Sequence, residues 1–140
     1  MTTPLGSFPA RVDELATILD ALATRAIELA VPDAVRDKLS LMVEELFLNT
    51  VHYGGAGVLL ATLALERLPD TVHLIYEDNG RAYDPFAHAN RETLTEDSAG
   101  RRIGGLGVIL IEGLASATHY ERLADRNRIQ LTLTLASPAM

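Results

Sequence analysis

The stretch Leu39–Gly55, LSLMVEELFLNTVHYGG, decides how the rest of the chain is arranged. Apolar residues recur through it at steps of three and four, the spacing of a helix with one buried face. Glu45 and Asn49 stand four residues apart and project from one face, at the edge of the apolar stripe, where burial without partners is costly. They are therefore either a solvated edge, with Glu45 paired locally, or part of a polar site. The stripe consists of Val35, Leu39, Met42, Leu46 and Thr50.

Length and composition indicate one domain over residues 1–140. The chain is 48% hydrophobic and carries 12 basic and 19 acidic residues, a formal net charge of −7. That balance argues against nucleic acid or an anionic membrane as a partner, because both favour a basic surface. The absence of cysteine excludes disulfides and thiolate metal sites. We see no signal-peptide pattern and no apolar run near the roughly 18 residues that span a bilayer, so we expect a cytoplasmic protein.

Helical periodicity appears in three segments. We expect helices from Ala10 to about Leu29, from Pro32 to Tyr53, and from Leu106 to Leu114. The buried stripe expected for the first helix is Val12, Leu15, Leu19, Leu22 and Ala26.

Strand patterns fill most of the remaining chain. In the strand at 71–77, the apolar side chains alternate toward one face, and His73 falls on the other as a surface or satisfied residue. Residues 1–9 form either an edge strand or a frayed tail. Two helices, a strand hairpin, a helix and two more strands indicate an α+β fold: a two-layer sandwich whose mostly antiparallel, mixed sheet is covered on one face by about three helices. The strands are expected at Val58–Leu65, Thr71–Glu77, Thr118–Arg122 and Ile129–Leu135.

A long segment without periodicity, residues 79–104, separates the second strand from the third helix. Connections of this length are uncommon inside a compact domain and are often functional. The segment is therefore either a lid over a ligand or a tolerated surface insertion.

Three short motifs together suggest a site for an adenine nucleotide. Glycines at 104–107 open a helix, where backbone N–H groups can approach phosphate. The carboxamide of Asn49 can join phosphate and water around Mg²⁺, and Glu45 can orient or deprotonate an attacking hydroxyl. Asp78 can accept a hydrogen bond from an exocyclic amine, and Gly80 leaves room for a flat base. Each motif alone is common in turns and helix caps.

The same three motifs resemble the N, G1 and G2 boxes of the GHKL ATPases. They read VEELFLN at 43–49, EDNGRAYDP at 77–85 and GGLGVILI at 104–111. The resemblance is greatest to the anti-sigma-factor serine/threonine kinases, because residues 83–86 are similar to their FDP segment and residues 127–133 are similar to their last strand. It covers the chain from about residue 10 to 135.

This resemblance implies the GHKL fold with an ATP lid loop, and a role for each matching residue. Asn49 would hold Mg²⁺ and bind ATP, Glu45 would be the catalytic base, and Asp78 with Gly80 would receive the adenine. Gly105, Leu106 and Gly107 would bind the phosphates through the lid backbone. The implied activity is ATP-dependent phosphorylation of a serine or threonine on a small anti-anti-sigma partner of the STAS type, whose unphosphorylated form frees a sigma factor.

The sequence also departs from that pattern. Thr50 follows the asparagine where the family usually has alanine, and Tyr53 stands where it often has histidine. We assign no role to Arg91, Arg101 and Arg102 in the lid, since charged loops are often simply solvated.

Three other functions fit the same sequence. The chain could be a non-catalytic ATP-binding regulator, or a sensor-kinase-like ATPase domain that works by protein interaction. It could also be an interaction domain whose boxes are vestigial. The polar face of the last strand, with Gln130, Thr132 and Thr134, is a candidate homodimer surface.

Overall fold

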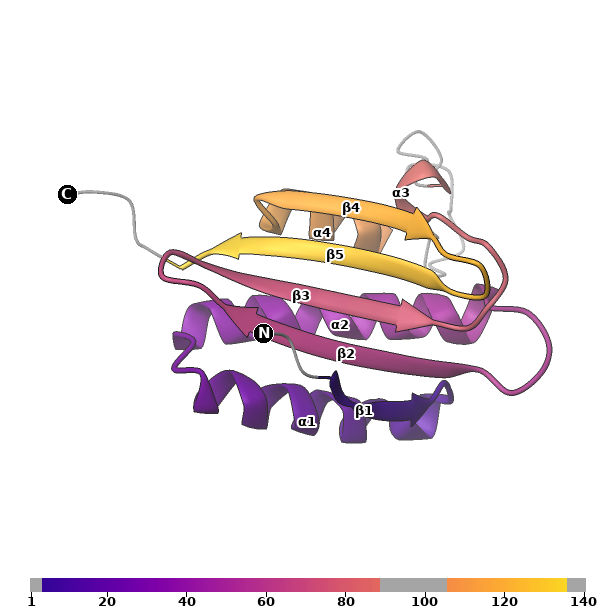
Figure 1. Cartoon of the computed structure of the whole chain (residues 1–140), viewed down its shortest axis with the longest axis horizontal. Helices are drawn as coiled ribbons and strands as arrows, with labels where there is room; N and C mark the ends of the chain where they lie inside the picture. Colours follow the sequence, from indigo (N-terminus) through magenta and orange to yellow (C-terminus); the bar gives the residue numbers. More distant parts are fainter. Residues whose placement is uncertain (1–3, 89–105, 136–140) are drawn as a thin grey trace, which may run out of the picture.

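A computed structural model describes residues 4–88 and 106–135 of the chain. Within them, one five-stranded sheet is covered on one face by helices, as Figure 1 shows. The expected α+β, two-layer fold is therefore confirmed. The elements in chain order are β1 (Pro4–Pro9), the 3₁₀ turn η1 (Val12–Glu14), α1 (Leu15–Glu28), α2 (Asp33–Tyr53), β2 (Leu60–Arg67), β3 (Thr71–Asp78), α3 (Pro85–His88), α4 (Leu106–Leu114), β4 (Ala117–Arg122) and β5 (Asn127–Thr134).

The strands lie in the order β1-β2-β3-β5-β4. Every neighbouring pair is antiparallel, so the parallel component of the expected mixed sheet is not found among the described strands. Short turns join β2 to β3 and β4 to β5, and the non-local pairing of β3 with β5 joins these two hairpins. In that pairing Asp78, the last residue of β3, stands opposite Asn127, the first residue of β5.

The core lies between the sheet and helices α1, α2 and α4. All five residues of the stripe expected on α2 are buried, as are the apolar side chains expected on β3. Those of β5 are buried as expected except Leu135, which lies just past the strand and is half-buried. His73 is half-buried and contacts Thr132 and Gln130, so the interpretation of a satisfied histidine holds.

The buried face expected for the first helix is found except at its start: Leu22 and Ala26 are buried, and Leu15 and Leu19 are half-buried against the core. Val12 is 60% exposed, and α1 buries Ile18, Leu22 and Ala26. The α-helix begins only at Leu15, after the η1 turn. Because a 3₁₀ turn has three residues instead of 3.6, it shifts the phase of the residues before it.

The second strand also begins later than expected. Gly55 and Gly57 have positive φ angles, so residues 54–59 form a loop in which Val58 is 82% exposed. Asn79 holds this loop against β2: its Oδ1 accepts the N–H of Leu60 at 2.7 Å, and its Nδ2 donates to the carbonyl of Val58 at 3.1 Å.

The long connection contains a short helix that its sequence did not suggest. Asp84 accepts the N–H groups of Phe86 and Ala87, at 2.9 and 3.3 Å, and so caps α3. Pro85 suits the first turn because its nitrogen has no hydrogen to satisfy. Most of the predicted lid, from residue 89 onward, lies outside the described residues.

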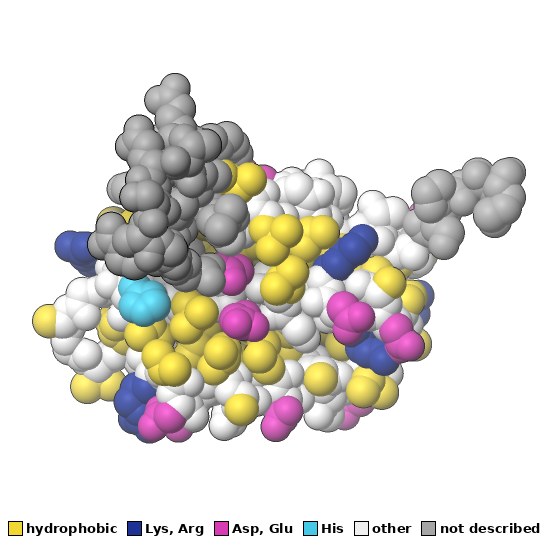
Figure 2. Space-filling model, turned by 180° about the vertical axis from the view of Figure 1, so that it is seen from behind, with side chains coloured by type: hydrophobic (Ala, Val, Ile, Leu, Met, Phe, Trp, Pro, Cys, Tyr) yellow, Lys and Arg dark blue, Asp and Glu magenta, His cyan; other side chains and the backbone are white. Residues whose placement is uncertain are grey.

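Figure 2 shows the face that the helices form. Hydrophobic side chains are interspersed with acidic ones on it, and Leu41 of α2 and Leu110 of α4 are about two-fifths exposed. No helix within residues 4–88 and 106–135 is both long and apolar enough to cross a membrane.

Candidate functional site

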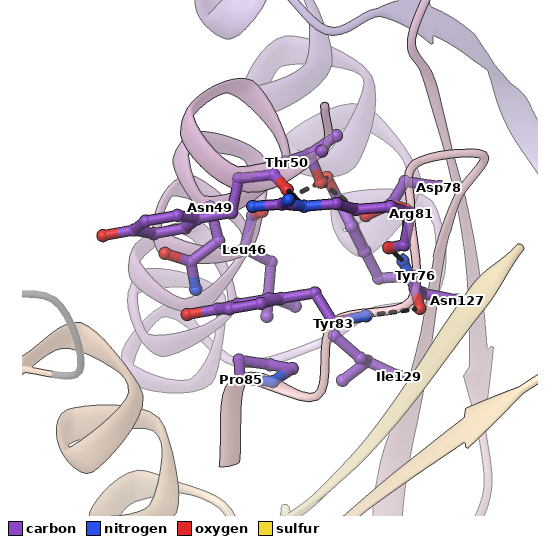
Figure 3. A pocket seen from close by; sticks show the side chains of 12 residues that line it. Leu46, Asn49, Thr50, Tyr76, Asp78, Arg81, Tyr83, Pro85, Asn127 and Ile129 are labelled. Atoms are coloured by element: carbon purple, nitrogen blue, oxygen red, sulfur yellow. Dashed lines mark hydrogen bonds between the residues drawn. The ribbon is translucent and has the colours of Figure 1, made fainter. Parts of the chain in front are cut away.

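A small pocket lies where the C-terminal end of α2 meets the end of β3, as Figure 3 shows. Asn49 reaches it from α2 and Asp78 from β3, so two residues that are 29 positions apart in the sequence share one pocket. Gly80 and Glu45 do not line it. The lining residues are Leu46, Asn49, Thr50, Tyr53, Gly54, Tyr76, Asp78, Arg81, Tyr83, Pro85, Asn127 and Ile129.

The carboxylate of Asp78 is held by three protein donors. Its Oδ1 accepts the backbone N–H of Gly80 and the side-chain Nδ2 of Asn127, each at 2.9 Å. Its Oδ2 accepts the hydroxyl of Thr50 at 2.7 Å. These bonds fix the side chain in one orientation at the pocket wall.

Thr50 connects Asp78 to a buried phenol. The hydroxyl oxygens of Thr50 and Tyr76 are 2.6 Å apart, and burial raises the pKa of the Tyr76 phenol. The phenol therefore stays protonated and donates a hydrogen bond to Thr50, which in turn donates one to the carboxylate of Asp78. The contact from Thr50 to the carbonyl of Leu46 is longer, at 3.2 Å. Thr50, which departs from the family pattern, thus helps to hold Asp78 in place.

The side chain of Asn127 bonds to five neighbours in the pocket region, although the sequence predicted no role for it. It is only 3% exposed. Its Nδ2 donates to Asp78 and, at 2.8 Å, to the carbonyl of Arg81. Its Oδ1 accepts the N–H of Tyr83 at 3.2 Å, the hydroxyl of Tyr120 at 2.5 Å and the guanidinium of Arg122 at 3.2 Å. An asparagine at the start of a strand signals a turn, and only the pairing of β3 with β5 reveals this network.

Two tyrosines contribute an aromatic wall. The rings of Tyr53 and Tyr83 stack with centroids 5.0 Å apart and planes inclined by 18°. The Nε of Arg81 donates to the carbonyl of Tyr53 at 2.9 Å, which ties the end of α2 to the segment after β3. Burial raises the pKa of the Tyr83 phenol, so that ring carries no charge near pH 7.

The structure explains why position 80 is occupied by glycine. A Cβ at this position would lie 2.9 Å from the Cα and 3.0 Å from the carbonyl oxygen of Gly54. The two glycines let the chain leaving β3 pass close to the end of α2, and the N–H of Arg81 bonds to the carbonyl of Gly54 at 2.9 Å. The expected place of Gly80 beside a base stays a prediction.

The remaining predicted residues lie elsewhere. Glu45 is 7% exposed and stands on α2 one turn before Asn49, outside the pocket lining. Leu106 and Gly107 begin α4, and Gly105 lies outside the described residues.

The donor set fits a magnesium ion only if a ligand shares in holding it. Residues 4–88 and 106–135 contain no group of three or more acidic or histidine side chains that could hold a metal. Mg²⁺ keeps much of its water and binds through few protein oxygens plus phosphate. The carboxamide of Asn49 suits that arrangement, with phosphate and water as the other ligands.

Comparisons with known proteins agree with this fold. A chain of the SiaB–SiaC complex from Pseudomonas aeruginosa is similar, with a TM-score of 0.54 and 18% identity, over 96% of this chain and 89% of that one. The histidine kinase AdeS from Acinetobacter baumannii is similar with a TM-score of 0.51 and 17% identity, over 94% of this chain and 68% of that one. A search of curated proteins found no match. The family described as histidine kinase-like ATPase domain matches residues 8–133. The match confirms the GHKL resemblance, and the chain belongs to this family of histidine kinase-like ATPase domains.

Proposed function

We propose that this protein binds ATP in the pocket between α2 and β3 and transfers the terminal phosphate to a serine or threonine of a small partner protein. The observation that carries the proposal is that Asn49 and Asp78, from two separate boxes of the family, line one pocket. Membership of an ATPase family supports the nucleotide.

Each residue has a distinct task in this proposal. Asp78 accepts a hydrogen bond from the exocyclic amine of adenine through Oδ2, which still has acceptor capacity. Asn49 contributes its carboxamide oxygen to Mg²⁺, which neutralises phosphate charge when bound. Glu45 takes the proton of the attacking serine or threonine hydroxyl. The oxygen of that hydroxyl bonds to the terminal phosphorus, and the bond from this phosphorus to the bridging oxygen breaks to release ADP. The backbone of Gly105, Leu106 and Gly107 binds the phosphates.

The partner in this proposal is an anti-anti-sigma protein of the STAS type. The phosphorylation state of this partner controls whether the kinase holds a sigma factor. The motif resemblance supports this choice. The similar chain in the SiaB–SiaC structure comes from a complex of two proteins. A homodimer through the polar face of β5 and a cytoplasmic location remain predictions.

One observation favours a second candidate, a non-catalytic ATP-binding regulator. Glu45 is buried and does not line the pocket that holds Asn49 and Asp78. A base that cannot reach the attacking hydroxyl would leave ATP as a conformational ligand.

Calorimetric titration with ATP, with Mg²⁺ and then with a chelator, tests the nucleotide site. We expect saturable binding that weakens without Mg²⁺ and in Asn49→Ala, but not in the control Gln130→Ala, whose carboxamide lies on the open face of the sheet. No binding at millimolar ATP would refute the proposal.

Phosphate transfer from labelled ATP separates the two candidates. The assay would use a STAS-type protein as the acceptor and compare the wild-type chain with Glu45→Gln. Loss of transfer with retained ATP binding supports the kinase. Binding without transfer in the wild type supports the regulator, and unchanged transfer in the variant removes Glu45 from the mechanism.

A further inference from the structure

We infer that Asn127 is a positioning residue that makes the pocket select a purine with an exocyclic amine over one with a carbonyl in that place. The inference rests on the proposed function, because it concerns how the same pocket recognises a nucleotide base. Three observations carry it: the occupancy of the Asp78 oxygens, the fixed orientation of the Asn127 amide, and the second pair of bonds that Asn127 makes.

The first observation is how few acceptor positions Asp78 has left. An ionised carboxylate accepts about four hydrogen bonds, two at each oxygen. Gly80 and Asn127 fill Oδ1, and Thr50 takes one position on Oδ2. Counting donors from residues 4–88 and 106–135, one acceptor position remains, on Oδ2, and Asp78 lines the pocket. A ligand that meets this carboxylate must therefore present a hydrogen-bond donor at a single place.

The second observation is that the amide of Asn127 has one possible orientation. The N–H of Tyr83 and the guanidinium of Arg122 can only donate, so they identify the oxygen of the amide. The carboxylate of Asp78 and the carbonyl of Arg81 can only accept, so they identify the nitrogen. Because the side chain is 3% exposed, water competes little for these bonds.

The third observation links Asp78 to the aromatic wall. Asn127 bonds the carbonyl of Arg81 and the N–H of Tyr83, so one side chain holds both the carboxylate and the segment that carries the stacking ring. The antiparallel register places Asn127 directly opposite Asp78. The distance between the acceptor on Asp78 and the face of Tyr83 is therefore set by this residue, from β5.

The expected effect is on the preference between two bases. Adenine presents an amine to the free position on Oδ2, whereas hypoxanthine presents a carbonyl oxygen, which the carboxylate repels. Without Asn127, Oδ1 keeps only the bond from Gly80 and regains one acceptor position, so the carboxylate is held less firmly and the difference between the two bases shrinks. A hydrogen bond to a charged group typically accounts for about tenfold in affinity, and we expect a loss of discrimination of that size.

The experiment measures dissociation constants for ATP and inosine triphosphate on the wild type, Asn127→Ala and Asn127→Val. Valine has no hydrogen-bond donor and favours a strand, so it protects folding if alanine does not. The matched control is Tyr120→Phe, which removes one donor to Asn127 and leaves both bonds from its Nδ2 in place. We expect the wild type and the control to prefer ATP, and both Asn127 variants to lose about tenfold of that preference.

The outcomes separate this inference from the proposed function. Equal weakening of both nucleotides in the Asn127 variants would mean that Asn127 is merely structural, and would overturn the inference while ATP binding stands. A wild type that binds both nucleotides equally would overturn it as well. A wild type that binds neither would overturn the proposed function and, with it, the premise of this inference.

Discussion

The ring of Tyr53, the last residue of α2, stacks on the ring of Tyr83, five residues beyond the end of β3. Both rings line the pocket that also holds Asn49 and Asp78. A flat base that binds there must use one of these faces or displace the pair.

We predict that Tyr83→Ala weakens ATP binding by about five- to thirtyfold, because a stacked aromatic contact contributes about 1–2 kcal/mol. Tyr83→Phe keeps the ring and should bind as the wild type does. Isothermal titration of the three proteins would measure the change. Unaltered affinity in Tyr83→Ala would show that the base does not use this face.

Thr50→Val should lower the free energy of unfolding by about 1–3 kcal/mol, because it leaves the phenol of Tyr76 and one oxygen of Asp78 without their shared partner. Urea unfolding followed by circular dichroism would measure it. The control is Thr132→Val on the open face of the sheet, where the hydroxyl contacts His73. Because His73 is only half-buried, its ring can bond to water when this hydroxyl is removed. There we expect less than about 1 kcal/mol. Equal losses in the two variants would contradict a special role for Thr50.

Gly80→Ala should destabilise the fold by about 1–3 kcal/mol, since the new Cβ would meet backbone atoms of Gly54 that cannot move aside easily. Gly113→Ala is the matched control. A Cβ there has nothing within 4 Å and sits in α4, so it should raise stability by up to about 1 kcal/mol. Thermal unfolding of both variants checks the opposite signs.

The ion pairs on the open face predict how acid affects stability. Burial alone would raise the pKa of Glu77, but hydrogen bonds from Arg128 and Arg126, at 2.5 and 3.0 Å, outweigh it and lower the pKa below its ordinary value of 4.5. A carboxyl whose folded pKa is lowered stabilises the fold above its unfolded pKa, and that contribution is lost as pH falls through the folded value. We therefore expect Glu77→Gln to lose up to about 1 kcal/mol at pH 7 and to show a flatter decline in acid.

Urea unfolding at a series of pH values between neutrality and strong acid would test this. The free energies of the wild type and Glu77→Gln should converge as the carboxyl takes up its proton. Parallel profiles would mean that Glu77 does not carry the acid dependence.

Periodicity was enough to predict most of the fold. On α2, four apolar residues and Thr50 repeat over about four turns, and β5 alternates for its whole length, so these two buried faces follow from the period alone. The pattern failed at Val12 and Val58, where a 3₁₀ turn and two glycines with positive φ break the regular geometry. Apolar residues next to such breaks resemble members of a buried helix or strand, but they lie outside it and are exposed.

The candidate site was predictable only in part. Asn49 and Asp78 belong to recognisable motifs, and the structure places both in one pocket. Asn127 could not be found this way, because its importance depends on which strand pairs with β3 and in which register. Thr50 was expected on the buried stripe and as a departure from the family pattern, but a helical hydroxyl gives no sign of a carboxylate 28 residues later. Contacts between distant segments carry the information that local patterns lack.

All four tyrosines of the chain belong to this one region: Tyr53, Tyr76 and Tyr83 line the pocket, and Tyr120 bonds to Asn127. The chain has no tryptophan. Its near-ultraviolet absorption and intrinsic fluorescence therefore arise around the candidate site, and hardly from anywhere else. Unlabelled protein thus has a built-in optical probe, and ligands that enter the pocket can be followed by tyrosine emission alone.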